Sequence, residues 1–164
     1  MAQLVNLDNL QKLLQEMAGD IRDGYKETLE RNGRYTALGP EARKLIRSVQ
    51  TRVVVGETAY EVVMDLEDYW KYVEDDTRPH WPPHDAILRW VTFKPVLPRP
   101  DSNGRLPSPE SLTYLIRRKI SRVGTKGTHD LEKTKDAVIT AYRRELEQAL
   151  AHDIEDYILK VANP

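Results

Sequence analysis

The stretch YEVVMDLEDYWKYVEDDTRPH, residues 60–80, decides the fold more than any other part of the chain. It begins with β-branched residues, which favour a strand, and passes into an aromatic and acidic patch. It ends at Arg78-Pro79-His80. Proline lacks a backbone donor and restrains the residue before it, so neither a helix nor a strand continues through this corner.

The residues before this stretch complete a β-hairpin. Strand-favouring residues, most of them β-branched, alternate on both sides of a break at Gly56-Glu57, which is the pattern of two paired strands. The alternating positions are Val49, Thr51, Val53 and Val55 before the break, and Tyr60, Val62 and Met64 after it. The sequence therefore predicts a small antiparallel sheet.

Helical spacing occurs at both ends of the chain. Near the amino terminus apolar side chains recur every three or four positions from Leu7 to Tyr25, with Asp8 or Asn6 as a candidate cap. Residues 130–161 carry a second apolar stripe, longer than a small core requires. We expect this long helix to pack on the amino-terminal helix, on a neighbouring subunit, or on both.

The middle of the chain is rich in proline, so residues 79–109 favour neither a long helix nor a central strand. Within it, residues 84–91 predict a short helix. Residues 94–109 predict a long extended loop, which is either an arm that reaches a neighbour or a simple connector.

Two further helices are predicted from their first residues. Ser108 and Pro109 suit the cap and the first position of a helix that Gly124 would end. Its predicted apolar face contains Leu112, Leu115, Ile116 and Ile120. A short helix that starts near Pro40 would turn Leu45-Ile46 inward.

Length predicts one domain, 1–164, and the predicted antiparallel hairpin and helices are those of an α+β fold. The chain has 25 Lys and Arg against 26 Asp and Glu, so the whole molecule has no electrostatic bias toward DNA or an anionic membrane. The absence of cysteine excludes disulfides, thiolate catalysis and cysteine-ligated zinc. Because no apolar run approaches the length of a membrane span, and no signal-peptide core is present, we expect a soluble protein made in the cytoplasm.

Two groups of residues could carry chemistry. His80 and His84 have the spacing of metal ligands on a helix, but Pro82 and Pro83 lie between them. Six carboxylates match neither a calcium loop nor a paired-carboxylate site, which favours a solvated or interface-facing surface. They are Asp65, Glu67, Asp68, Glu74, Asp75 and Asp76. Since no catalytic motif is present, we expect no enzyme, no metal and no cofactor.

A basic set brackets the turn at residues 124–127. Its members are Arg117, Arg118, Lys119, Arg122, Lys126, Lys133 and Lys135. The balanced total charge favours pairing of this set with an acidic patch on the next subunit, and contact with phosphate is the alternative. Trp70, Trp81 and Trp90 flank the proline corner. Tryptophan supplies binding energy at interfaces and packing in cores, and we expect both roles here.

Two stretches resemble the structural proteins that join heads to tails in tailed bacteriophages. In that family a strand leads into a Tyr-x-x-Tyr-Val-Glu run, a tight turn and a Thr-Arg-Pro-His-like exit. The matching residues are Tyr69, Tyr72, Val73, Glu74, Thr77, Arg78, Pro79 and His80. Asp76 stands where the family usually has Gly at the turn, and Asp tolerates the left-handed region. Residues 119–126 resemble the Lys-Ile-x-Arg-x-Gly-x-Lys run of versions from Bacteroides phages.

The resemblance covers residues 45–126 and implies a virion protein of the phage neck, of the head–tail joining or tail completion kind. Such proteins assemble as a symmetric ring whose loops insert into neighbours. The expected partners are further copies of the chain and other neck, portal or tail proteins, with non-specific contact to passing DNA as an option and no membrane. The predicted interface residues are Trp70, Tyr72, Trp81, Trp90, Leu97, Leu106, Arg117, Arg118, Arg122 and Tyr157. The alternative is a phage-encoded accessory protein that binds DNA, or regulates, through the basic patch.

Overall fold

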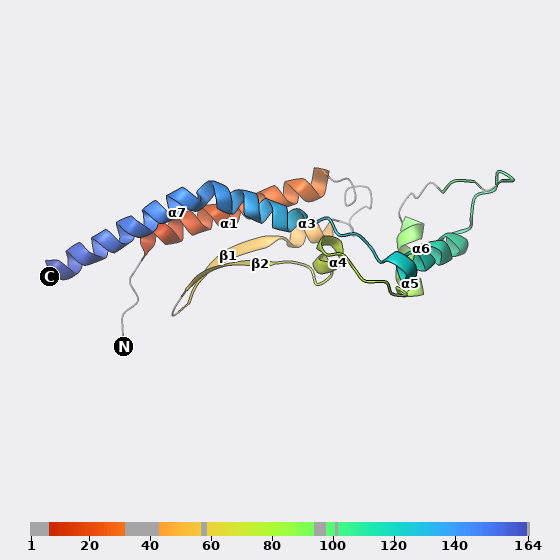
Figure 1. Cartoon of the computed structure of the whole chain (residues 1–164), viewed down its shortest axis with the longest axis horizontal. Coiled ribbons are helices and arrows are strands. Elements are labelled where there is room, and N and C mark those ends of the chain that lie inside the picture. The colour runs from red at the N-terminus through yellow and green to blue at the C-terminus, as the bar shows by residue number, and fades with distance from the viewer. Residues whose placement is uncertain (1–6, 32–42, 57–58, 94–97, 101, 164) are drawn as a thin grey trace. The chain divides into compact units, whose positions relative to one another are not determined.

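The computed structural model describes residues 7–31, 43–56, 59–93, 98–100 and 102–163. A two-stranded antiparallel sheet accompanies a long helix at each end of the chain (Figure 1), which confirms the α+β class expected from the sequence. Where the length predicts one domain, the chain divides into two compact units. Unit 1 comprises Met1–Arg31, Leu45–Glu67 and Asp130–Pro164, and unit 2 comprises Asn32–Lys44 and Asp68–His129.

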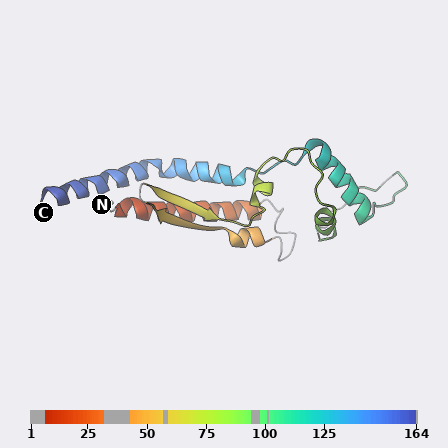
Figure 2. The same ribbon diagram turned by 90° about the horizontal axis from the view of Figure 1, so that it is seen from below.

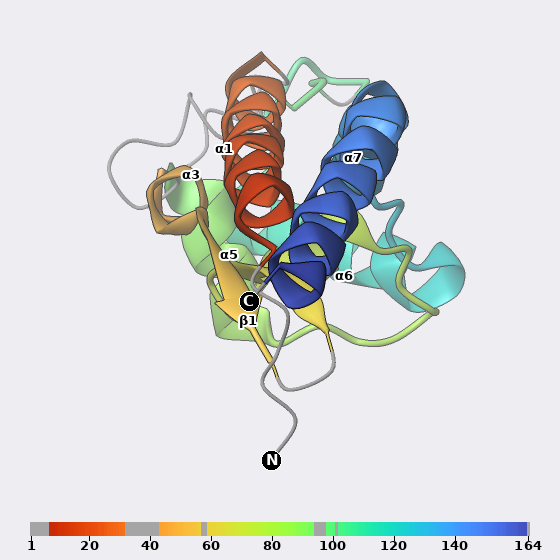
Figure 3. The ribbon, with the colours of Figure 1, turned by 90° about the vertical axis from the view of Figure 1, so that its left-hand side faces the viewer.

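Two long helices form the framework of unit 1. α1 (Asp8–Arg31) and α7 (Asp130–Ala162) lie side by side and run in opposite directions (Figures 1 and 2). Asp153 near the end of α7 therefore meets Asn9 near the start of α1. Figure 3 shows the same pair from the carboxyl end of α7. Among the described helices, the 33-residue α7 included, none is long and apolar enough to cross a membrane.

The core of unit 1 is built around α1. The apolar face predicted for the first helix is buried at Met17, Ile21 and Tyr25, which removes these side chains from water and stabilises the unit. Its earlier residues, Leu7, Leu10, Leu13 and Leu14, are half-buried. The buried apolar residues of this unit are Met17, Ala18, Ile21, Tyr25 and Leu29 of α1, and Leu45, Ile46 and Val49. Leu45 and Ile46 lie on the short helix α3 (Lys44–Ser48), so the prediction that they turn inward is confirmed.

The predicted hairpin packs against α1. β1 (Gln50–Val55) pairs with β2 (Tyr60–Asp65) in antiparallel register, with Val53 opposite Val62. The hydroxyl of Thr51 donates to the carbonyl oxygen of Ala18 in α1 at 2.9 Å, and this bond attaches the first strand to that helix. The predicted hairpin is therefore confirmed, and its register pairs Thr51 with Met64 and Val55 with Tyr60 across the sheet.

Unit 2 contains three helices within its described residues. α4 (Trp70–Glu74) follows the hairpin, and α5 (His84–Phe93) packs against α6 (Pro109–Val123). The predicted start of α6 is confirmed, because the side chain of Ser108 accepts from the backbone amide of Ser111 at 3.2 Å. Its predicted end at Gly124 is also confirmed. The described residues of the 94–109 loop, 98–100 and 102–108, form neither helix nor strand.

Three local predictions are corrected. Leu115 was expected on the inner face of α6, but it is 51% exposed and the fully buried residue is Thr113. Thr113 shares a helical stripe with Ile116 and Ile120, whereas Leu115 lies about 100° away from Ile116 around the helix. The turn at Asp76 does not use the left-handed region, since His129 is the non-glycine residue with positive φ among those described. The cap of α1, expected from Asp8 or Asn6, comes from Asp153 of α7, whose carboxylate accepts from a backbone amide in the first turn of α1. Asn6 lies outside the described residues.

Candidate interaction surfaces

An aromatic and cationic cluster lies at the start of the proline-rich segment in unit 2. The guanidinium of Arg117 stacks over the ring of Trp81, 5.3 Å from its centroid, and its Nε donates to the carbonyl oxygen of Pro82 at 2.9 Å. Tyr114, one turn earlier on α6, has its ring centroid 6.5 Å from that of Trp81. Trp81 is 55% exposed and Tyr114 54%. The cluster therefore fixes a cation beside two accessible aromatic rings.

Next to this cluster α6 presents a charged face. The exposed residues on it are Tyr114, Leu115, Arg118, Lys119 and Arg122, and we call this set the α6 outer face. Within the described part of the chain, the side chains of Arg118, Lys119 and Arg122 have no ion-pair partner. A surface with unpaired cations beside aromatic and aliphatic side chains suits an acidic partner.

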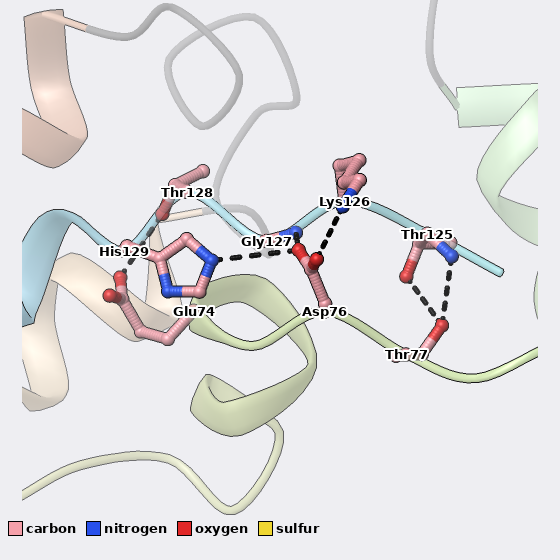
Figure 4. A network of polar contacts seen from close by, with 8 residues as sticks. All are labelled: Glu74, Asp76, Thr77, Thr125, Lys126, Gly127, Thr128 and His129. Atoms are coloured by element: carbon pink, nitrogen blue, oxygen red, sulfur yellow. Dashed lines mark hydrogen bonds and ion pairs between the residues drawn. The ribbon is translucent and has the colours of Figure 1, made fainter.

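The stretch at residues 69–80 and the stretch at residues 119–126 meet in unit 2. Residues 73–77 run beside residues 124–129, and we call this contact the clasp (Figure 4). The amide of Thr77 donates to the carbonyl oxygen of Thr125 at 2.9 Å, and the two hydroxyls lie 2.7 Å apart. The amide of Thr125 in turn donates to the hydroxyl of Thr77 at 2.9 Å. These bonds join the two ends of the segment that carries α5 and α6.

Asp76 binds the other side of the clasp. Its carboxylate accepts from the Lys126 ammonium at 2.6 Å and from the Gly127 amide at 2.9 Å, and it lies 3.5 Å from the ring of His129 (Figure 4). The hydrogen bond from Lys126 is the main cause that lowers the pKa of Asp76 to about 2, and the amide of Gly127 is the second. Lys126, expected to pair between subunits, therefore pairs within its own chain.

Two glycines allow the clasp to close. A Cβ built on Gly124 would overlap the backbone of Thr77, and one built on Gly127 would overlap the backbone of Glu74. Gly124 also has φ of +70°, a conformation that side chains disfavour. Glu74 is 3% exposed, and its side chain accepts from the hydroxyl of Thr128 at 3.2 Å. The prediction of a solvated acidic patch is therefore wrong for Glu74, because the clasp covers it.

An acidic groove lies in unit 1 between α1 and α7. It has a volume of about 250 Å³. Its lining residues are Asn9, Lys12, Leu13, Glu16, Glu145, Gln148 and Ala149. Beside it the hydroxyl of Tyr142 donates to Asp20 at 2.6 Å. This bond, with burial and the charges of Asp20, Glu16 and Glu145, raises the pKa of Tyr142 to about 12. The three carboxylates thus place a concentrated negative field on one side of the helix pair.

The last turns of α7 extend beyond the start of α1 (Figure 1) and expose apolar side chains. The exposed residues are Leu150, Ile154, Tyr157, Ile158, Leu159 and Val161, which we call the α7 end. Leu150, Ile154, Tyr157, Ile158 and Val161 recur at helical spacing on one side of α7, and Leu159 lies about 100° further round the helix from Ile158. An exposed apolar stripe of this kind is typical of a contact surface. The sequence predicted an apolar stripe that is longer than a small core requires. The part of it from Leu150 onward is the part that α1 leaves exposed.

The two units carry opposite charge. Unit 1 has 18 Asp and Glu against 11 Lys and Arg, a formal net charge of −7. Unit 2 has 14 Lys and Arg against 8 Asp and Glu, a formal net charge of +6. The total of −1 conceals this separation, so the absence of bias inferred from the whole chain does not hold for either unit.

The predicted interface residues occupy several places. Trp81, Arg117, Arg118 and Arg122 lie in the cluster and on the α6 outer face. Trp70 and Tyr72 lie on α4, Trp90 on α5, and Leu106 on the described part of the loop. Tyr157 belongs to the α7 end in unit 1, and Leu97 lies outside the described residues. The exposed residues of this set are Tyr72, Trp81, Trp90, Leu106, Arg118, Arg122 and Tyr157.

Sequence reasoning missed Tyr114, which completes the aromatic cluster, and the carboxylates Glu16, Asp20 and Glu145. The helical period could have placed Tyr114 and Arg118 on one face, since they are four residues apart. Packing of the last helix on the first was one of the expectations from the sequence, but no local signal sets the register that places Tyr142 beside Asp20. Among the described residues, no group of three or more His, Asp or Glu is arranged to hold a metal ion.

The chain was compared with protein-family models, with curated proteins and with solved structures, and none of the three comparisons gives a match.

Proposed function

We propose that this chain is a structural protein of a tailed-phage neck, which joins head to tail as a symmetric ring. The observation that carries the proposal is the clasp. The Tyr69–His80 stretch and the 119–126 stretch carry the resemblance to head–tail joining proteins, and Thr77 and Thr125 bring these two stretches into one contact. Two separate matches that meet in space support a shared substructure better than either match alone.

The charge separation supports assembly from identical subunits. When a unit of −7 and a unit of +6 belong to one chain, contacts between unlike units of two copies are attractive. Such head-to-tail contacts are heterologous and generate rings when the rotation closes. The α7 end offers further apolar area for contact with a neighbour.

The loop at residues 94–109 is the proposed arm. Prolines in this part of the sequence favour an extended backbone at little entropic cost, and Leu106, which is exposed, is an apolar anchor for a neighbouring subunit. Deleting residues 100–106 should leave the helix content unchanged and prevent incorporation into virions. Infectious particles of normal yield from this deletion would show that the segment is a connector.

Negative-stain imaging of the purified protein, together with protein mass analysis of purified particles, tests the ring. The expected result is a closed ring in solution or on particles, and a copy number in the particle that corresponds to one ring. A protein that is monomeric at high concentration and absent from particles would overturn the proposal.

The second candidate is an accessory DNA-binding protein. The α6 outer face favours it, because unpaired cations beside exposed Tyr114 and Trp81 could hold phosphates and stack bases. The measurement is the affinity for single- and double-stranded DNA over a range of salt concentrations. DNA binding that falls steeply with salt, without any self-association, would favour this function over the ring.

A further inference from the structure

We propose that the α6 outer face of one copy docks on the acidic groove between α1 and α7 of a second copy. The inference rests on the proposed ring and names the two surfaces that would make its repeating contact. It pairs three cations of unit 2 with three carboxylates of unit 1, none of which forms an ion pair with a described residue of its own chain.

The cationic side of the contact is defined by Arg118 and Arg122. They lie four residues apart on α6, so they project from one face, with Lys119 and Leu115 beside them. Arg117 is already held by the ring of Trp81 and by the carbonyl oxygen of Pro82. These two contacts fix the orientation of the Arg117 side chain, which borders the α6 outer face. Arg118 and Arg122 remain available for bidentate contacts with carboxylates.

The anionic side is defined by Glu16, Asp20 and Glu145. No described residue forms an ion pair with any of the three, and the bond that Asp20 makes is to the hydroxyl of Tyr142. Glu16, Glu145 and Lys12 line the groove and sum to −1, and Asp20 adds a further negative charge beside it, where it accepts from Tyr142. Leu13 and Ala149 give the groove an apolar part that an aliphatic or aromatic side chain of α6 could cover.

A second copy is the occupant that the charges favour. The groove belongs to the unit of −7 and the α6 outer face to the unit of +6, so each copy carries both halves of the contact. Nucleic acid could meet the α6 outer face, but it would be repelled by the groove and would leave that surface without a partner. Pairing between copies uses both surfaces.

Reversing charge on one surface at a time tests the contact. Variant one is Arg118→Glu with Arg122→Glu, and variant two is Glu16→Lys with Glu145→Lys. All four side chains are exposed, so folding should persist, and this is checked by circular dichroism. Sedimentation at low salt should show that each variant alone associates at least about tenfold more weakly than wild type, because like charges then face each other.

The equimolar mixture of the two variants is the decisive sample. The acidic α6 of variant one matches the basic groove of variant two, and the unaltered surfaces of the two variants also match. Association should therefore return on mixing, which a contact within one chain could not produce. A mixture that stays monomeric, or a single variant that associates as tightly as wild type, would overturn the inference.

Two controls separate this contact from other effects. Lys71→Glu with Arg89→Glu makes the same change in net charge on other exposed residues of unit 2 and should leave association unchanged. If variant one loses affinity for a single-stranded oligonucleotide while its self-association is that of wild type, the surface binds nucleic acid and the inference is wrong. A wild-type protein found in particles that does not associate through these surfaces would overturn the inference and leave the proposed function standing.

Discussion

Asp153 accepts a hydrogen bond from the backbone amide of Leu10 at 2.8 Å, although the two residues are 143 positions apart. The same carboxylate accepts from the amide of Asn9 at 3.1 Å and from its side chain at 2.7 Å. The first turn of a helix leaves amides without intrahelical partners, and its partial positive charge favours an anion. The end of α7 therefore caps the start of α1.

Replacing Asp153 should destabilise unit 1. Asp153→Ala leaves two partly buried amides of the first turn without this acceptor, so the free energy of unfolding should fall by about 1–2 kcal/mol. Asp153→Asn, which keeps one acceptor oxygen, should lose less. Urea unfolding measures the change, with Glu155→Ala on the exposed side of the same helix as control. Equal losses for Asp153→Ala and Glu155→Ala would contradict the cap.

The clasp can be tested by comparing Gly→Ala substitutions at two positions, where opposite effects on stability are expected. Gly127→Ala would place a methyl group into the backbone of Glu74, where no side chain can rotate away, and should cost about 1–3 kcal/mol or more. Gly19→Ala lies in α1 with nothing within 4 Å of the new group. It should stabilise the protein by up to about 1 kcal/mol. Thermal melts of both variants check the sign, and a neutral Gly127→Ala would refute the close approach.

Asp76 gives the clasp a defined dependence on acid. Its pKa in the folded protein is about 2, below the ordinary 3.8, first because of the hydrogen bond from Lys126. A lowered pKa stabilises the fold above pH 3.8, and this contribution is lost as the pH falls toward 2. Asp76→Asn should therefore be less stable than wild type at neutral pH, with a difference that shrinks below pH 4. Melts over this range measure it, and a difference independent of pH would contradict the assignment.

Tyr142 should titrate at unusually high pH. Its pKa is raised to about 12, first by the hydrogen bond to Asp20 and then by burial. A raised pKa means that the neutral phenol stabilises the fold fully below pH 10, and that this contribution is lost as the pH rises toward 12. The tyrosinate absorbance of wild type minus that of Tyr142→Phe isolates this group. Asp20→Asn should shift its titration to lower pH, and an unshifted curve would show that Asp20 is not the cause.

The sequence could predict the features that depend on neighbouring residues, but not those that depend on residues far apart along the chain. Ser108 and Gly124 bound α6 as expected, because capping and left-handed turns depend on neighbouring residues. The burial of Glu74 was missed, since the residues that cover it lie about fifty positions away. The charge separation was missed for a different reason. Each unit gathers stretches from distant parts of the sequence, and averaging over the chain cancels their charges.

Substitutions at two leucines can distinguish the core of unit 1 from its proposed contact surface. Leu29 is fully buried and Leu159 is 60% exposed on the α7 end. Leu29→Ala should lower the free energy of unfolding by about 2–5 kcal/mol because it leaves a cavity. Leu159→Ala should change it by less than about 0.5 kcal/mol.

If the α7 end contacts a neighbour, Leu159→Ala should instead weaken self-association while its urea curve matches wild type. Sedimentation and urea unfolding of the same samples measure both effects. A Leu159→Ala protein that unfolds early would place this residue in the core, and one that is unchanged in both measurements would remove the α7 end from the contact surface.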